Sequence, residues 1–268
     1  MTQTFKTSDG IRLAYDVTDF TDPWTRKPPL ILLHAAMGSR DRWYAMVPAL
    51  ARRHRVIRLD LRGHGRSEVP PPDSALTMPR LVADVRALMD HLGCGPAHVV
   101  GNSAGGYIAQ NLAMDAPDRV RSLVLFGSTP GLMHSQARTW LPRVAAEGLR
   151  GFLSATIADR FPRGHDPAHV AWFLDEAAKN DPAWIGRFVG LMTGLWWMDA
   201  LPRIACPTLL VAPGAETVGS GAAYAEMAAR IPDCELVSYA ALPHNICDIV
   251  PDRCAADVLA FLARRFPQ

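Results

Sequence analysis

The chain reads Ala97-His98-Val99-Val100-Gly101-Asn102-Ser103-Ala104-Gly105-Gly106 across its most informative segment. The Gly-x-Ser-x-Gly spacing suits a tight turn from a buried strand into a helix, because only small neighbours fit beside such a turn. The turn would hold Ser103 exposed, in a strained backbone conformation. The helix behind it would point backbone N–H groups and the positive end of its dipole toward the same place. Ser103 is therefore the candidate nucleophile.

Short apolar runs alternate with helical patterns on both sides of this segment, and each run suits a strand buried on both faces. The apolar spacing between Thr77 and Leu92 predicts an amphipathic helix. A second helix follows Ser103 until Pro117, and Pro251 opens a third. We therefore predict an α/β fold, with a doubly wound, mostly parallel sheet and helices on both of its faces. The expected strands are residues 30–34, 56–60, 97–101, 120–126, 207–211 and 235–239, after an N-terminal hairpin around Asp9-Gly10.

The alternation is interrupted once, between Gly127 and Pro207. This part of the chain has helical patterns, no convincing strand, and five of the seven tryptophans. Loops of that length are rare in compact domains, so we infer an inserted helical lobe. The predicted division is a core of residues 1–127 and 206–268 and a helical cap of residues 128–205.

Charge and composition argue against a nucleic-acid-binding protein, a membrane protein and a protein held together by disulfides or zinc. The 28 basic and 26 acidic side chains give a net charge of +2, with no basic stripe of the kind that nucleic acid or an acidic membrane surface requires. The apolar runs are far shorter than the ~18 residues that cross a bilayer, and the start of the chain lacks the pattern of a secretory signal. The five widely spaced cysteines form no Cys-x-x-Cys pair, which disfavours a disulfide framework and a zinc site. We expect a cytoplasmic protein without a metal, and neither nucleic acid nor a membrane as its partner.

A histidine near the C-terminus is the candidate base. A serine hydroxyl is a poor nucleophile until a base takes its proton, and the base needs an acid to orient it. His244 lies in the loop between the last predicted strand and the last helix, where the chain order serine, acid, histidine puts the base. The acid should follow the preceding strand, and Glu216 is the only acid in the loop there. Alternatives for this role are Asp199, Asp233 and Asp248.

Two backbone N–H groups are the candidate oxyanion hole. One is that of Ala104, which follows the nucleophile, and the other should come from the loop after the strand at residues 30–34. That loop contains small residues, which let the backbone approach a substrate, and we nominate the N–H of Ala36.

Taken together, the motifs resemble those of the α/β-hydrolase superfamily. Residues 34–39 resemble its oxyanion loop, residues 60–67 its Asp-x-Arg-Gly-His-Gly-x-Ser turn, and residues 101–106 its serine-bearing turn, with His244 in the expected place. Within the superfamily, the position of the cap and the phrase at residues 197–204 are similar to 3-oxoadipate enol-lactonase-like serine esterases.

The resemblance and the candidate residues together imply a serine hydrolase that cleaves a small carboxylic ester or lactone through an acyl-enzyme, without a cofactor. The implied partner is a small-molecule substrate, and the chain is expected to be a monomer or a homo-oligomer. Two alternatives stay open. One is a carbon–carbon bond hydrolase of a ring-cleavage product, and the other is a non-catalytic ligand-binding or receptor member of the fold.

The sequence departs from the superfamily pattern at three places. Ala35 stands in the oxyanion loop where glycine is usual, and Pro243 replaces the glycine before the histidine. Glu216 stands where aspartate is usual, with Thr217 in the usual register of the acid. The changes at Pro243 and at Glu216 bear on how His244 is oriented.

The cap is expected to roof the substrate pocket. Its tryptophans and methionines, such as Met192 and Met198, would select an apolar or aromatic group. Cap arginines such as Arg138, Arg143 and Arg187 are candidates for pairing with a substrate carboxylate, although a solvated surface charge is the simpler interpretation of each.

Overall fold

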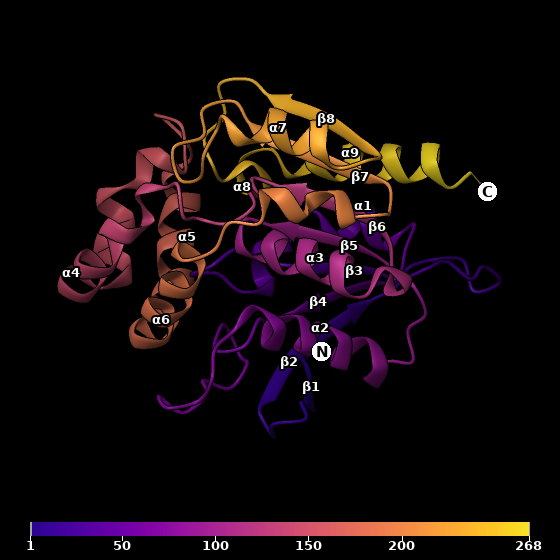
Figure 1. Cartoon of the computed structure of the whole chain (residues 1–268), viewed down its shortest axis with the longest axis horizontal. Helices are drawn as coiled ribbons and strands as arrows, with labels where there is room; N and C mark the ends of the chain where they lie inside the picture. The colour runs from indigo at the N-terminus through magenta and orange to yellow at the C-terminus, as the bar shows by residue number, and fades with distance from the viewer. Residues whose placement is uncertain (1, 268) are drawn as a thin grey trace.

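The structure is a computed structural model that describes residues 2–267. Its strands are β1 (Gln3–Lys6), β2 (Arg12–Thr18), β3 (Leu30–Leu33), β4 (Val56–Leu59), β5 (Ala97–Asn102), β6 (Val120–Phe126), β7 (Thr208–Pro213) and β8 (Cys234–Tyr239). Within the described residues they form one eight-stranded sheet with the order β1-β2-β4-β3-β5-β6-β7-β8 (Figure 1). β1 and β2 form the predicted antiparallel hairpin, β2 pairs antiparallel with β4, and the remaining neighbours are parallel.

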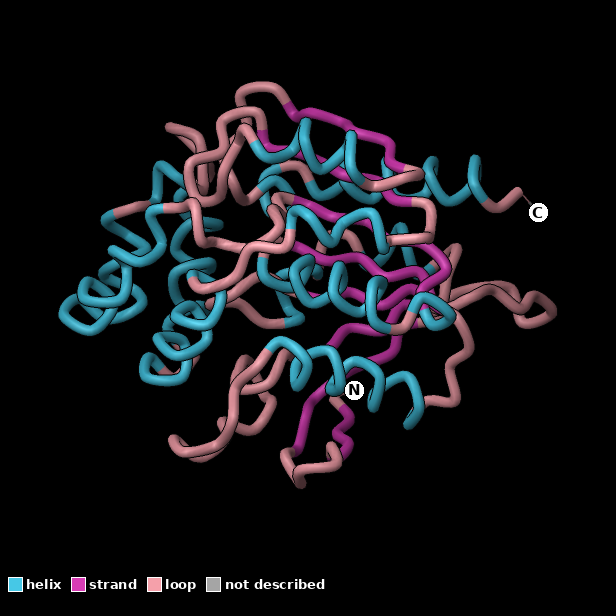
Figure 2. Tube along the Cα trace, in the orientation of Figure 1, coloured by secondary structure: helices cyan, strands magenta, loops and turns pink. Residues whose placement is uncertain are grey.

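Helices cover both faces of the sheet (Figure 2). The helices of the core are η1 (Arg40–Trp43), α1 (Val47–Ala51), α2 (Met78–His91), α3 (Ala104–Asp115), η2 (Pro117–Arg119), α7 (Ala223–Arg230), α8 (Ile246–Ile249) and α9 (Pro251–Arg265). Along β3, Ile31 and Leu33 pack in the cluster that contains α2, α3 and α7, whereas Leu30 and Leu32 pack in the cluster that contains α1 and α9. The predicted α/β fold with a doubly wound, mostly parallel sheet is confirmed.

The ends of two predicted helices follow from their sequences. α2 begins after Thr77, whose side-chain oxygen accepts a hydrogen bond from the N–H of Arg80 at 3.3 Å, as a helix N-cap does. α9 begins at Pro251, as predicted, because proline fits the first turn of a helix. No helix in residues 2–267 combines the length and the apolar character that crossing a bilayer requires.

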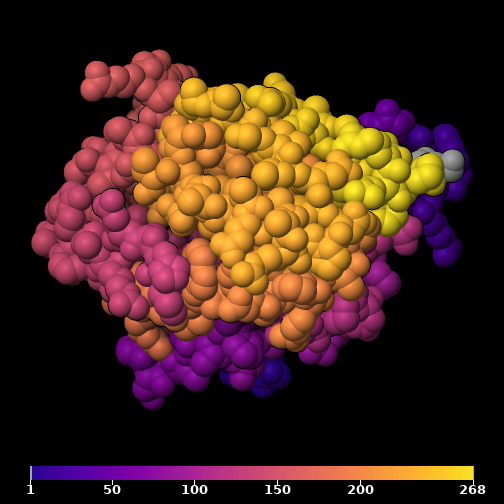
Figure 3. All heavy atoms as spheres, turned by 45° about the horizontal axis from the view of Figure 1, so that its top comes forward, coloured from indigo at the N-terminus to yellow at the C-terminus, as the bar shows by residue number. Residues whose placement is uncertain are grey.

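All regular structure between β6 and β7 is helical. The helices there are η3 (Gln136–Thr139), α4 (Trp140–Ala155), η4 (Ile157–Asp159), α5 (Pro167–Ala178), α6 (Pro182–Thr193) and η5 (Met198–Arg203). α4, α5 and α6 gather beyond one end of the sheet, at the left of Figure 1. In the space-filling view of Figure 3 the atoms of this segment lie directly beside those of the C-terminal third of the chain. The boundaries of core and cap at residues 127 and 206 stay a prediction.

The turn from β5 into α3 is built around close backbone contacts. Ser103 has φ 50° and ψ −117°, outside the regions that ordinary residues prefer. A side chain on Gly101 would overlap the backbone of Gly106, and one on Gly105 would overlap the carbonyl of Leu33. The small residues of the predicted turn therefore let α3 lie against β3 and β5 directly behind the serine.

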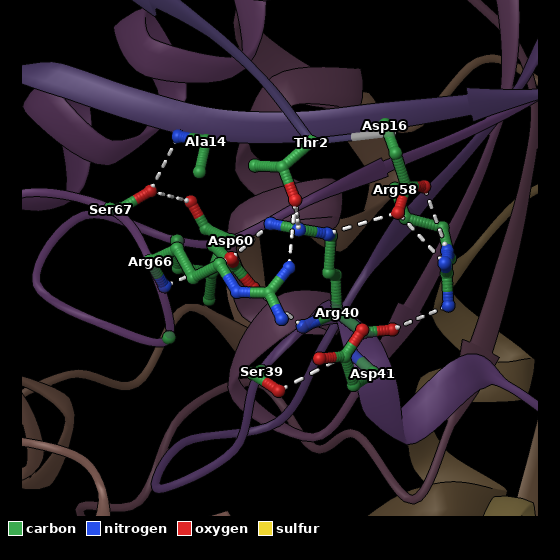
Figure 4. Close-up of polar contacts among 12 residues, drawn as sticks. Thr2, Ala14, Asp16, Ser39, Arg40, Asp41, Arg58, Asp60, Arg66 and Ser67 are labelled. Carbon is green, nitrogen blue, oxygen red and sulfur yellow. Dashed lines mark hydrogen bonds and ion pairs between the residues drawn. The ribbon is translucent and has the colours of Figure 1, made fainter.

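A buried ionic network anchors the loop that follows β3 (Figure 4). The side chain of Arg40 pairs with Asp60 and, at 3.0 Å, with Asp16. The backbone N–H of Arg40 donates to Asp60 at 2.7 Å, and the backbone N–H of Arg66 donates to the other oxygen of the same carboxylate at 3.0 Å. Asp60 therefore ties the end of the candidate oxyanion loop, residues 34–39, to the turn after β4.

Gly105→Ala tests the packing of this turn. We expect it to lower the free energy of unfolding by about 1–3 kcal/mol, the usual cost of forcing an extra methyl group into a packed interior. Urea-induced unfolding measures the change. Gly186→Ala is the matched control, because Gly186 lies inside α6 with nothing within 4 Å of an added methyl group, and there alanine should stabilise the helix by about 0.5–1 kcal/mol. An unfolding midpoint for Gly105→Ala equal to that of the wild type would contradict this description.

Candidate active site

The structure brings Ser103, His244 and Glu216 into one hydrogen-bonded chain, although they lie on three separate loops. His244 Nε2 lies 3.1 Å from Ser103 Oγ. On the other side of the ring, His244 Nδ1 lies 2.8 Å from Glu216 Oε2 and 3.0 Å from Oε1. An ionised carboxylate only accepts hydrogen bonds, so the imidazole proton lies on Nδ1 and leaves Nε2 free to accept from the serine hydroxyl.

The carboxylate of Glu216 is buried and fully hydrogen-bonded. Its Oε1 accepts from the backbone N–H groups of Val218 and Gly219 at 2.8 and 3.0 Å, and its Oε2 accepts from the hydroxyl of Tyr224 at 3.0 Å. Burial alone would raise the pKa of Glu216, but its electrostatic interaction and hydrogen bond with His244 and these backbone hydrogen bonds outweigh burial and lower the pKa to about 2. Glu216 is therefore ionised at neutral pH and suited to orient the histidine.

The other acids considered for this role bind elsewhere. Asp248 is buried, and its Oδ1 accepts from Arg42 Nε at 2.6 Å. Asp199 is almost fully exposed and pairs with Arg230 at 2.9 Å, and Asp233 pairs with Arg265. Among residues 2–267, Glu216 is the acid within hydrogen-bond distance of His244.

Thr217, in the superfamily's usual register of the acid, has a different partner. Its hydroxyl donates to Asp159 at 2.9 Å. Glutamate has one methylene group more than aspartate, which gives a carboxylate one position earlier in the loop the reach to meet the histidine. The departure at residue 216 is therefore accommodated by side-chain length.

Ala36 and Ala104 line the same cavity as Ser103. The backbone N–H of Ala104 is at the start of α3, and within residues 2–267 neither it nor that of Ala36 donates to a protein acceptor. The left-handed backbone of the oxyanion loop falls at Met37, with φ 60°, and not at Ala35. The alanine where glycine is usual therefore sits in a conformation that any residue adopts.

The cavity is narrow and mostly apolar. Its volume is about 50 Å³, so all but the smallest molecules require the lining side chains to move. Its apolar lining includes Leu132, Trp140, Leu153, Phe173, Val189 and Met192. Within residues 2–267, no group of three or more His, Cys, Asp and Glu side chains is arranged to hold a metal ion.

Most of the tryptophans between β6 and β7 lie outside this cavity. The indole N–H of Trp184 donates to the carbonyl of Arg62 at 2.9 Å, and that of Trp197 donates to Gln110 at 2.9 Å. Of the five tryptophans between β6 and β7, Trp140 alone lines the cavity. The apolar lining that this segment contributes therefore consists of aliphatic side chains, Met192, Phe173 and Trp140.

A short segment between β6 and β7 contacts the loops that carry His244 and Glu216. The carbonyl of Asp159 accepts from the N–H of His244 at 3.2 Å, and the carbonyl of Arg160 accepts from the N–H of Asn245 at 3.3 Å. The contact from Thr217 to the side chain of Asp159 joins the acid loop to the same segment. The position of His244 thus depends on residues inserted between β6 and β7.

Sequence reasoning missed the arginines that reach the cavity. Arg138 donates to a backbone carbonyl of α6, Arg143 pairs with Glu147 in solvent, and Arg187 donates to the loop before α2. Instead Arg42 and Arg160 line the cavity, together with Asn245. No spacing signal marks them, because η1, η4 and the histidine loop meet only in the folded chain.

Comparison with known proteins places the chain in a family. The family model for the α/β hydrolase fold matches residues 28–205, and the chain belongs to this family. It is 39% identical over 142 residues to the dihydrolipoyllysine-residue acetyltransferase component of the acetoin cleaving system of Pseudomonas putida, covering 53% of this chain and 37% of that one. It is 36% identical over 132 residues to the pimeloyl-[acyl-carrier protein] methyl ester esterase of Aeromonas hydrophila, covering 49% of each. These matches span half or less of the relatives' lengths.

Solved structures match nearly the whole chain. A hydrolase from Pseudomonas aeruginosa PA01 is 31% identical with a TM-score of 0.86, over 97% of this chain and 98% of that one. The enol-lactonase from Burkholderia xenovorans LB400 is 23% identical with a TM-score of 0.88, over 97% of this chain and all of that one. The resemblance to the α/β-hydrolase superfamily inferred from the motifs is confirmed.

The lowered pKa of Glu216 predicts how acid affects stability. The folded pKa of about 2 lies below the ordinary value of 4.5, so the stabilisation by Glu216 is present above pH 4.5 and is lost as the pH falls toward 2. The difference in unfolding free energy between the wild type and Glu216→Gln should therefore shrink by about 1 kcal/mol per pH unit below pH 4. Urea unfolding between pH 5.5 and pH 3 measures it, with the exposed Glu226→Gln as control. A difference that stays constant over this range would contradict the environment described for Glu216.

Proposed function

We propose that the chain is a serine hydrolase that cleaves a small carboxylic ester or lactone through an acyl-enzyme. The observation that carries the proposal is the chain of hydrogen bonds from Ser103 through His244 to Glu216, at one wall of a cavity. A serine in this arrangement is an activated nucleophile.

In the proposed reaction His244 takes the proton of Ser103, and the serine oxygen attacks the carbonyl carbon of the substrate. Glu216 holds the imidazole in the required tautomer and stabilises its protonated form. The imidazolium then gives its proton to the leaving alkoxide. A water molecule deprotonated by His244 hydrolyses the acyl-enzyme, which releases the acid and restores Ser103.

The negative charge that develops on the substrate oxygen needs donors in place before the reaction. The N–H groups of Ala36 and Ala104 have no protein acceptor within residues 2–267 and belong to the lining of the cavity. We assign them the role of the oxyanion hole, whose donors typically contribute about a hundredfold or more each to the rate. The proposed chemistry uses protein groups and water alone.

The proposed substrate class rests on the cavity and on the relatives. The cavity is small and its roof apolar, which favours a small acyl or alcohol group. A hydrolase, an esterase and an enol-lactonase are among the proteins to which the chain is similar, and they support a hydrolytic activity. We further propose that residues 128–205 act as the cap over a core of residues 1–127 and 206–268.

Ser103→Ala tests the identity of the nucleophile. We expect the wild type to react covalently with a fluorophosphonate and to hydrolyse short-chain p-nitrophenyl esters, and the variant to lose labelling and about three orders of magnitude or more in kcat. The exposed Ser154→Ala in α4 is the matched control. A wild type that is neither labelled nor active would overturn the proposal, and turnover that persists in Ser103→Ala would place the nucleophile elsewhere.

Glu216→Gln tests the acid. The amide cannot hold the imidazole in the same tautomer, so kcat should fall by about two to four orders of magnitude. The rate of p-nitrophenyl ester hydrolysis near neutral pH is the measurement, with Glu226→Gln beside it. An unchanged rate would remove Glu216 from the mechanism.

Product analysis separates the alternatives. Turnover of a vinylogous diketone with cleavage of a carbon–carbon bond, in preference to esters, would favour the ring-cleavage hydrolase. Ligand binding without any turnover or fluorophosphonate labelling would favour the non-catalytic receptor.

A further inference from the structure

One arginine in the wall of the cavity is buried without a carboxylate partner. Arg160 is 6% exposed and lines the cavity together with Ser103 and His244. Among residues 2–267, no carboxylate lies within ion-pair distance of its guanidinium group. Asp159 and Glu216 are near enough for their negative charges to raise the pKa of Arg160, although burial has the larger, opposite effect. Burying an unpaired charge is costly, so its retention calls for an explanation.

The other deeply buried arginines make the contrast plain. Arg40 binds the carboxylates of Asp16 and Asp60. Arg62 binds those of Asp9 and Asp84. Arg40 and Arg62, which have structural roles, are therefore each neutralised by two acids. Arg160 has no such acid among residues 2–267.

Most of the hydrogen-bonding capacity of Arg160 is unused. Its Nη1 donates to the carbonyl and the hydroxyl of Thr156 at 3.1 and 2.9 Å, whereas Nε and Nη2 donate to no residue that the structure describes. The guanidinium lies 5.6 Å from the ring of Trp140, which also lines the cavity. Burial lowers the pKa of Arg160 to about 10, which still leaves it protonated at neutral pH.

A second donor without an acceptor is the side-chain amide of Asn245, whose backbone is bonded to that of Arg160. Asn245 is 5% exposed and lines the same cavity, and its Nδ2 has no acceptor within residues 2–267. The backbone hydrogen bond from Asn245 to the carbonyl of Arg160 fixes the two residues next to each other. One charged donor and one neutral donor therefore belong to adjacent residues that line the cavity containing the candidate nucleophile.

Arg42 also reaches the cavity, but its charge is compensated. Its guanidinium forms a two-point ion pair with the buried carboxylate of Asp248. The cation without a paired acid in this wall is thus Arg160, and its single charge matches a monoanion. A carboxylate suits it best, because its two oxygens match the planar fork of a guanidinium group.

We propose that Arg160, with Asn245 beside it, binds a free carboxylate of the substrate, so that the substrates are esters or lactones that carry an acid group away from the bond that is cleaved. The proposal rests on the hydrolase function proposed above. With a half-ester, the acyl C–O bond breaks and water supplies a hydroxyl group to the acyl carbon and a proton to the leaving alcohol. The acid product is then a dicarboxylic acid.

The test compares acidic esters with neutral ones of the same shape. The probes are the p-nitrophenyl half-esters of glutaric, adipic and pimelic acid and the same esters in which the far carboxylate is a primary amide. For the wild type, kcat/KM should be at least tenfold higher for the acid than for the amide of one chain length. In Arg160→Met this ratio should fall by about tenfold to a hundredfold, the usual effect of losing hydrogen bonds to a charged group.

Three further variants show whether the effect belongs to the guanidinium. Arg160→Lys keeps the charge and should restore part of the ratio. Asn245→Leu should lower the ratio by about threefold to tenfold. Arg143→Met removes an exposed arginine of the same cap and should leave the ratio at the wild-type value. Equal losses on acid and amide esters in Arg160→Met and Arg160→Lys, or a wild type without preference for the acids, would overturn the proposal.

A binding measurement separates this proposal from the hydrolase function. Calorimetric titration of Ser103→Ala with glutarate should give binding that weakens at least tenfold when Arg160→Met is added, irrespective of turnover. Arginine-dependent binding in a protein without esterase activity would preserve the carboxylate site and overturn the hydrolase proposal. Efficient hydrolysis of neutral esters with no arginine-dependent binding would overturn the carboxylate site and preserve the hydrolase proposal.

Discussion

The backbone at Ser103 is the constraint on which the rest of the site depends. A φ of 50° at a serine is a strained conformation, which costs about 1–3 kcal/mol and persists only where the surroundings enforce it. Here the close packing of α3 against β5 and the end of β3 enforces it, and Gly101 and Gly105 permit that packing because they have no side chains. That approach points the serine hydroxyl and the first N–H groups of α3 at one cavity.

The candidate oxyanion loop and the loop that carries His244 are held near this turn by two sets of contacts. Each set joins residues that are far apart in the sequence. The ion pair and the backbone hydrogen bond between Arg40 and Asp60 hold the candidate oxyanion loop after β3. The histidine loop is held by the carbonyls of Asp159 and Arg160, which belong to the inserted segment. The segment between β6 and β7 therefore takes part in positioning His244 and contributes polar groups to the cavity wall as well as apolar ones.

The sequence predicted the fold, and it selected three residues that the structure brings together, because the signals for the fold and for Ser103 are local. Short apolar runs mark buried strands, and a Gly-x-Ser-x-Gly turn between a strand and a helix marks Ser103. Position in the chain was enough to select His244 and Glu216, which the structure brings into contact. The choice of Glu216 over Asp248 could not be settled from the sequence, since it depends on Arg42, more than two hundred residues away in the chain, binding Asp248. The same reason hid Arg160 and Asn245, because donors without an acceptor among residues 2–267 can be recognised only in the folded chain.

The proposal that Ser103 carries the acyl group during turnover is tested most directly by trapping the intermediate. The protein is mixed with p-nitrophenyl acetate, quenched with acid within the first turnovers, digested, and its peptides sequenced by tandem mass spectrometry. We predict an acetyl group on Ser103 that disappears when the substrate is exhausted. Steady turnover with no acetyl group on Ser103, or with the acetyl group on another residue, would contradict the proposed mechanism.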